Sequence, residues 1–200
     1  MSDIDDVIEP VLMVFRTQLR ARLLSHAVTC YLNGSAQMTS FGHTLKGIPI
    51  TFEGPPMQDA INFANKHAAR LVKEIDTETR DRLAKTISDA IKEKRGVDGL
   101  ARDIRNEFDD MGKVRSKLIA RTETNTSLSK GSFDRAKDMG VTGKSWLTVG
   151  DGKVRPSHQQ NEAAGVIPID EKFPSGDLHP PGVDGFNCRC VTVFSMLEEE

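Results

Sequence analysis

The sequence predicts an α+β fold, in which an N-terminal helical bundle is followed by a small β-rich, loop-rich C-terminal domain. Up to about residue 140, apolar side chains recur at intervals of three and four, the period of amphipathic helices. From Trp146 onward, short β-branched and apolar runs alternate with Pro- and Gly-rich connections, which are typical of strands and loops. We therefore predict four parts: an N-terminal amphipathic helix with an extended arm (1–56), a helical bundle (57–140), a β-rich domain (141–194) and an acidic tail (195–200).

The composition is that of an ordinary globular protein, with 38% hydrophobic residues, 28% charged residues and a formal net charge of -2. This charge argues against a protein whose whole surface binds nucleic acid. No apolar run approaches the roughly 20 residues that span a bilayer, and the acidic N-terminus is unlike a secretory signal. Three cysteines do not make a disulfide framework, so we expect synthesis in a reducing cytoplasm and no membrane partner.

The first element predicted is one amphipathic helix over residues 3–32. Pro10 falls inside its apolar pattern and predicts either a kink or a helix start near position 9. Residues 33–56 are rich in Gly and Pro, beginning with Asn33-Gly34, and predict turns between short β-prone pieces. Pro49 limits residues 48–52 to an edge strand or an extended arm. The alternatives are an arm that pairs with a neighbouring sheet edge and a surface linker.

Residues 57–139 are predicted to be almost wholly helical. One apolar stripe extends over residues 61–75 and a second over residues 83–91. Asp98 is expected to cap a shorter helix, and a last helix is expected from about Lys113 to Gly140. Because the connections are short, neighbouring helices should be antiparallel and form a compact bundle.

The last of these helices has a polar interruption on its apolar face. Arg121, Thr122, Glu123 and Asn125 lie between apolar residues that resume at Leu128. Buried polar groups cost stability unless they are hydrogen-bonded, so we hypothesise that these side chains meet a polar partner surface, most plausibly residues 151–158. The alternative is that Arg121 merely extends to solvent.

In the C-terminal part, Asp151-Gly152 lies between two short β-prone runs and predicts a hairpin turn. The later run from residue 186 to residue 194 predicts a strand. On that strand Cys188 and Cys190 share one face with Phe186, while Arg189 points to the other face. We further expect Asp151 to pair with Arg155, His158 to bond the backbone, and Trp146 to fill the core with its N–H needing a partner.

These motifs carry a resemblance to a known family. The order Trp146, Asp151, Arg155, His158, then Phe173, then a proline-rich approach to Asn187-Cys188-Arg189-Cys190, resembles the phage Mu F-like minor head (head morphogenesis) proteins. The similarity includes the preceding helix around residues 118–125 and extends from about residue 61 to residue 194. The residues that carry it are Arg121, Thr122, Asn125, Trp146, Asp151, Arg155, His158, Asn187, Cys188, Arg189 and Cys190.

The resemblance implies a minor structural protein of a tailed-phage head rather than an enzyme. Such a protein is expected in the virion, in the head interior or at the head–tail connector. Its implied partners are the portal protein, the major capsid protein, or both. Its implied role is to bind the portal or the capsid interior during assembly and to help link packaging with ejection.

His158, His179, Cys188 and Cys190 are of the ligand types that suit zinc. Against zinc, Cys-x-Cys is not the usual knuckle spacing, and His179 is not part of the family pattern. The alternative, which we favour, is that both cysteines are small buried residues, so no cofactor is expected.

Asp151 and His158, with Ser157 or a cysteine as nucleophile, are the minimum set of groups for general acid–base and nucleophilic catalysis. The alternative is that Asp151 is present because Asp-Gly is a favoured turn sequence, which accounts for this residue without a catalytic role.

A possible nucleic-acid contact lies on the helical part. Lys113, Arg115, Lys117 and Arg121 cluster near one helix start and would neutralise a few DNA phosphates without reading sequence. The alternative is a solvated helix face. Two other classes therefore stay open beside the head protein: a zinc-stabilised nucleic-acid-binding module, and a hydrolase or toxin-like enzyme that uses His158.

Overall fold

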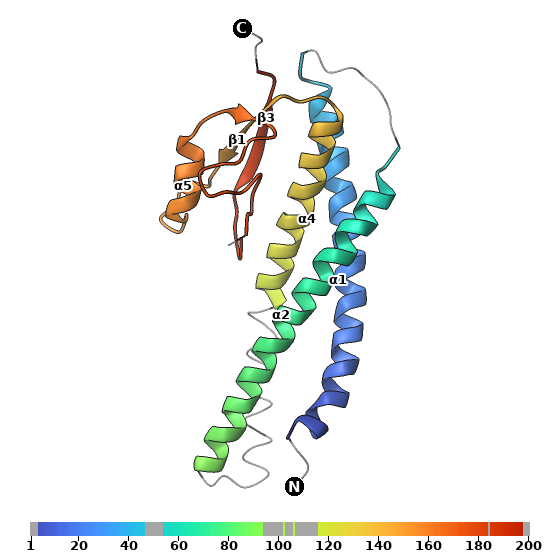
Figure 1. The fold of residues 1–200 in the computed structure, drawn as a ribbon, viewed down its shortest axis with the longest axis vertical. Helices are drawn as coiled ribbons and strands as arrows, with labels where there is room; N and C mark the ends of the chain where they lie inside the picture. The colour runs from blue at the N-terminus through green and yellow to red at the C-terminus, as the bar shows by residue number, and fades with distance from the viewer. Residues whose placement is uncertain are drawn as a thin grey trace.

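The computed structural model describes residues 4–46, 54–93, 102, 106, 116–183 and 185–197, and its architecture is α+β, as the sequence predicts. In the described part of the chain, three long helices precede a small antiparallel sheet, which has one short helix beside it (Figure 1). The helices are α1 (Ile4–Gly42), α2 (Met57–Lys92), α4 (Ser116–Asp138) and α5 (Pro156–Ala163), and the strands are β1 (Gly143–Leu147), β2 (Ile167–Pro168) and β3 (Val191–Ser195).

The long helices form an elongated bundle in which α1 packs against both α2 and α4 (Figure 1). Helix α2 is antiparallel to α1, whereas α4 ascends in the same direction as α1. The apolar stripe of α1 meets small and aromatic side chains of its two neighbours because all three helices are amphipathic. The buried residues of this interface include Ala27, Tyr31, Met38, Ala60, Ala64, Phe133 and Ala136.

Two glycines set the distance between α1 and α4. A Cβ added to Gly34 would lie 2.1 Å from the carbonyl oxygen of Leu128, and one added to Gly131 would lie 2.0 Å from that of Tyr31. Each glycine therefore lets the backbone of the other helix approach to within a distance that no side chain permits. Asn33-Gly34, expected to form a turn, instead lies inside α1, because this tight packing overrides the local turn preference.

Helix α1 is longer than the sequence predicts. It begins at Ile4 and includes Pro10, so the alternative of a start near position 9 is wrong, and it ends at Gly42 rather than near residue 32. Helix α2 is continuous over both apolar stripes expected between residues 57 and 92. The expected strand or arm at residues 48–52, the cap at Asp98 and the glutamates at 198–200 lie outside the described residues.

The sheet has the order β2-β1-β3, and both pairings are antiparallel. In the longer pairing, Gly143 lies opposite Ser195 and Trp146 lies opposite Thr192. One face of this sheet packs on the bundle through a cluster of Met38, Phe133, Ala136, Val141, Ile169 and Phe194. A second cluster, made of Trp146, Phe173, Cys188 and Cys190, forms the interior of the C-terminal domain.

Lys144 of β1 is fully buried between these two clusters. Its Nζ donates a 2.6 Å hydrogen bond to the carbonyl oxygen of Ile169. The same atom lies 5.0 Å from the centre of the Phe133 ring and 5.2 Å from that of Phe173, which places a cation between two aromatic faces. Burial lowers the pKa of Lys144 to about 8, only partly opposed by the nearby Asp170 carboxylate.

This pKa predicts a pH dependence of stability. The folded-state pKa of about 8 lies below the ordinary value of 10.5, so between these pH values the unfolded chain binds more protons. The free energy of unfolding should therefore rise with pH over this window, and Lys144→Met should remove that rise. Urea unfolding of wild type and variant across the window measures it, with exposed Lys172→Met as the control. A wild-type minus Lys144→Met difference that stays constant with pH would contradict the expectation.

Candidate functional site

Helix α5 positions His158, and the turn before it differs from the predicted hairpin. Asp151 Oδ1 accepts the backbone N–H of Lys153 at 3.0 Å, which closes a turn, but no strand follows it. Instead Pro156 occupies the first turn of α5, where a fixed φ and a missing N–H are tolerated and a sheet ladder is not. The hairpin prediction is therefore wrong, although Asp151 does make a turn.

Helix α5 is held against the end of β1 by a carboxylate. Glu162 Oε1 accepts the backbone N–H of Thr148 at 2.8 Å, and its Oε2 accepts the Thr148 hydroxyl at 2.7 Å. These two hydrogen bonds lower the pKa of Glu162 below its usual value. Because His158 and Asn161 are three residues apart on a helix, they share the inward face, and both are buried. Asn161 in turn bonds Ser175 through both ends of its amide.

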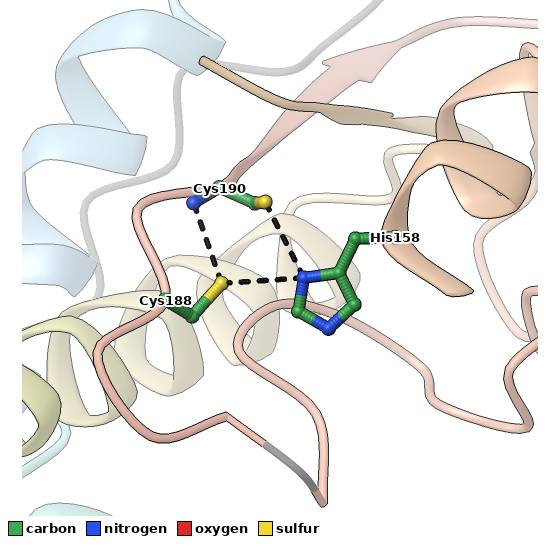
Figure 2. A group of neighbouring side chains, drawn as sticks. All are labelled: His158, Cys188 and Cys190. Carbon is green, nitrogen blue, oxygen red and sulfur yellow. Dashed lines mark hydrogen bonds between the residues drawn. The ribbon is translucent and has the colours of Figure 1, made fainter. Parts of the chain in front are cut away.

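Figure 2 shows the two cysteine sulfurs converging on one nitrogen of His158. His158 Nδ1 lies 3.6 Å from Cys188 Sγ and 3.5 Å from Cys190 Sγ, and all three side chains are buried. We call these three residues the His–Cys cluster. The nearest side-chain atoms to His158 Nδ1 in this cluster are thus sulfurs, and the backbone hydrogen bond expected for His158 stays a prediction. Burial raises the pKa of Cys188 to about 11, so the thiol is neutral near pH 7.

The two cysteines are both buried, as expected from a shared face, but they precede the strand rather than lie within it, since β3 begins at Val191. Phe186, predicted on the same face, is 47% exposed, so that part of the prediction is wrong. Trp146 covers the cluster from β1: its ring centre is 4.9 Å from that of His158, in an edge orientation. Trp146 Nε1 has no hydrogen-bond partner among the described residues.

His179 does not join the His–Cys cluster. Its ring packs against Phe133 with centres 4.9 Å apart, and its Nδ1 lies 2.7 Å from the carbonyl oxygen of Pro180. The only group of potential metal ligands found among the described residues is His158, Cys188 and Cys190. His179, which the sequence offers as a further zinc-type ligand outside the family pattern, is therefore not part of this set.

The polar interruption on α4 does meet a partner outside its own helix. Arg121 donates to Asn187 Oδ1 at 3.1 Å, and the backbone N–H of Asn187 donates to Thr122 Oγ1 at 3.0 Å. Asn125 donates to the carbonyl oxygen of Cys188 at 3.1 Å. The partner is thus the 187–188 segment, not residues 151–158. Glu123 points elsewhere, with its Oε2 2.7 Å from Nε2 of His67 on α2.

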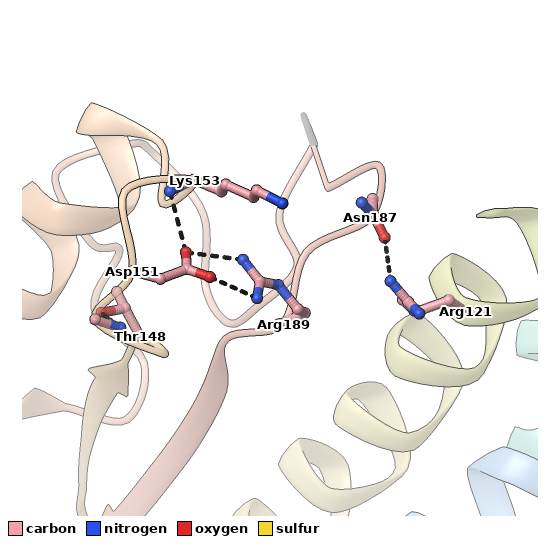
Figure 3. A network of polar contacts seen from close by, with 7 residues as sticks. Arg121, Thr148, Asp151, Lys153, Asn187 and Arg189 are labelled. Carbon is pink, nitrogen blue, oxygen red and sulfur yellow. Dashed lines mark hydrogen bonds and ion pairs between the residues drawn. The ribbon is translucent and has the colours of Figure 1, made fainter.

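The arginines of the C-terminal domain pair differently from the expectation. Arg189 donates two hydrogen bonds to the Asp151 carboxylate, at 2.7 Å and 2.9 Å (Figure 3). Arg155 instead donates to the carbonyl oxygen of Phe186. The predicted Asp151–Arg155 pair is therefore wrong, because Arg189 binds the Asp151 carboxylate in a bidentate pair through both terminal nitrogens of its guanidinium. That guanidinium also lowers the pKa of Asp151 below its usual value.

Four cationic side chains line one cavity of about 350 Å³ between α4 and the C-terminal domain. They are Arg121, Lys153, Arg155 and Arg189, and the remaining lining comes from Phe186 and Asn187. Figure 3 shows Lys153 extending past the Asp151–Arg189 pair toward Asn187 and Arg121. We call this the cationic cavity. Sequence reasoning missed Lys153; the signal was its place two residues before Arg155 in a part of the chain with few basic residues.

These features define a class: an α+β structural module in which a helical bundle carries a small sheet, joined to it by hydrogen bonds from α4. Residues 67–193 match the family model described as Phage Mu protein F like protein. Since the match covers more than half of the chain, this protein belongs to the phage Mu F-like family. The family is a structural one of phage head morphogenesis and implies a virion component.

No curated protein and no solved structure matches the chain. Among the described residues, no helix combines the length and apolar character needed to cross a membrane.

Proposed function

We propose that this chain is a minor structural protein of a tailed-phage head, without enzymatic activity, that binds the portal or the capsid interior during assembly and helps link packaging with ejection. The observation that carries the proposal is the family match, which extends from α2 to β3. The contacts of the motif residues support it. Arg121, Thr122 and Asn125 all hold the 187–188 segment, so they serve to fix one part of the molecule on another.

A structural role also accounts for the interior of the C-terminal domain. His158, Cys188 and Cys190 are buried beneath Trp146 rather than presented at a surface. Ser157, the hydroxyl considered as a nucleophile, follows Pro156 at the start of α5, and His158 Nδ1 faces the sulfurs of Cys188 and Cys190. This arrangement supports a rigid docking unit carried by the bundle.

The test is mass spectrometry of purified particles together with a pull-down against the portal protein encoded beside this gene. We expect the polypeptide in mature particles and co-purification with a portal oligomer. Retention by the major capsid protein alone would place it on the capsid interior instead of the portal. Particles that contain every other head component but lack this polypeptide would refute the proposal.

A second role, sequence-independent contact with packaged DNA, is favoured by the cationic cavity. Of the described residues that line it, four are cationic and none is acidic, and the nearby Asp151 carboxylate is paired with Arg189. Arg121 donates to the amide oxygen of Asn187 and Arg155 to the carbonyl oxygen of Phe186. Both acceptors are neutral, so these contacts leave the arginine charges available to phosphate. Of the residues expected to contact DNA, Lys113 and Arg115 lie outside the described residues, Lys117 lies in α4, and Arg121 belongs to the cavity.

Charge reversal at Lys153 tests this contact. Lys153→Glu should weaken binding of duplex DNA at low salt, and should reduce the slope of log affinity against log salt by about 1. The matched control is Lys172→Glu, which makes the same charge change at an exposed residue outside the cavity. Fluorescence anisotropy over a salt series measures both quantities. Equal losses in the two variants, or no binding by wild type at low ionic strength, would count against the contact.

A further inference from the structure

The His–Cys cluster has the composition and spacing of a metal site. One nitrogen and two sulfur ligand atoms, from His158, Cys188 and Cys190, all lie within 4.8 Å of one another. We propose that these three side chains bind a single zinc ion as a structural staple of the C-terminal domain. No fourth side-chain ligand accompanies them in the described part of the chain, so water completes the tetrahedron. This site is independent of the proposed function.

The two nitrogen–sulfur distances in the cluster match those of a zinc tetrahedron. Zinc bonds of about 2.0–2.1 Å to nitrogen and 2.3 Å to sulfur, at tetrahedral angles, place a nitrogen and a sulfur ligand roughly 3.5–3.6 Å apart. The two observed separations from His158 Nδ1 are 3.6 Å to Cys188 Sγ and 3.5 Å to Cys190 Sγ. Each sulfur therefore already lies at the distance from the imidazole nitrogen that a shared zinc ion requires.

The convergence of both sulfurs on one nitrogen is a second argument. A neutral imidazole nitrogen has one lone pair, so it accepts one well-aligned hydrogen bond, and two thiols facing it compete. A metal at the centre of the triangle engages all three atoms at once. In addition, the backbone N–H of Cys190 points at Cys188 Sγ at 3.4 Å, a donor that suits a thiolate better than a thiol.

A metal ion at this place would link two segments of the C-terminal domain. His158 comes from α5, whereas the cysteines lie just before β3, and the described residues between them form no regular element besides the two-residue strand β2. Small loop-rich domains bury little apolar surface, and a metal often supplies the missing stability. Here the ion would tie both segments beneath Trp146, whose ring edge already packs on His158 and on Phe173.

The chain offers a matched control in its third cysteine. Cys30 is buried and has a histidine, His26, beside it at 3.5 Å, but this pair has no second sulfur. Cys30→Ser thus removes a buried thiol next to an imidazole without touching the His–Cys cluster. The test variants are Cys188→Ser, Cys190→Ser and His158→Gln, each expressed and purified under reducing conditions with zinc in the medium.

Metal analysis should give about one zinc per chain for wild type and Cys30→Ser, and much less for the three test variants. A chelator should lower the melting temperature of the first two proteins and leave the variants unchanged. Because a variant can fail to fold, wild type is also stripped and refilled with Co²⁺. A sulfur-to-cobalt charge-transfer band is then expected. No zinc and no such band in wild type, a Cys188–Cys190 disulfide by mass, or full zinc in all three test variants would overturn the proposal.

Discussion

Replacing Gly131 by alanine should lower the free energy of unfolding by about 2–3 kcal/mol, although alanine is the better helix former. The added Cβ would lie 2.0 Å from the carbonyl oxygen of Tyr31, which is backbone and cannot rotate away. Helices α1 and α4 must then separate, and the core around Met38 and Phe133 loses contacts. This loss outweighs the roughly 1 kcal/mol that alanine gains over glycine in helix propensity.

Gly42→Ala is the matched control for this prediction. Gly42 is the last residue of α1, whereas Gly131 lies in α4, and a Cβ on Gly42 would meet the Cε atom of Met139, the far end of a flexible side chain. Its cost should therefore be small, since methionine repacks easily. Chemical denaturation followed by far-ultraviolet circular dichroism compares the two variants. If Gly131→Ala proved as stable as Gly42→Ala, the close backbone approach would not be what limits this interface.

Trp146→Ala should destabilise the protein by about 3–5 kcal/mol. The indole is only 1% exposed and contacts His158, Phe173 and both cysteines of the C-terminal core. Truncation to alanine leaves a cavity that the surrounding structure refills only in part. Trp146→Phe, which keeps an aromatic edge, should cost less than the alanine variant.

The control is Leu147→Ala on the same strand, because Leu147 is 48% exposed and its truncation should change stability by less than about 0.5 kcal/mol. Trp146 is the only tryptophan of the chain, so circular dichroism must replace intrinsic fluorescence in the comparison. Losses of similar size in Trp146→Ala and Leu147→Ala would show that the indole does not anchor this core.

Several features of the fold and site could be predicted from local pattern. Apolar periodicity determines which segments are helical because each turn of helix repeats the same face, and α2 and α4 follow it. Alternation along an extended chain placed Cys188 and Cys190 on one side and Arg189 on the other, since successive side chains point oppositely. The polar interruption around Arg121 indicated a partner because buried polar groups need one.

Local pattern could not identify the partners themselves. Asp151 pairs with Arg189 rather than with nearby Arg155, and Arg121 bonds Asn187 rather than residues 151–158. Both outcomes depend on where the chain returns after a long connection, which no short-range preference encodes. The same holds for Gly34, which is helical rather than in a turn because its backbone packs closely against that of Leu128 on α4.

The sequence by itself therefore determined the α+β class, the helical faces and the residue types of the site. Only the tertiary structure decided that three ligand atoms meet beneath Trp146, that His179 stays apart, and that Lys153 joins three arginines around one cavity. The physical reason is that helix and turn preferences act over a few residues. Burial, pairing and ligand geometry depend on distances between segments that are far apart along the chain.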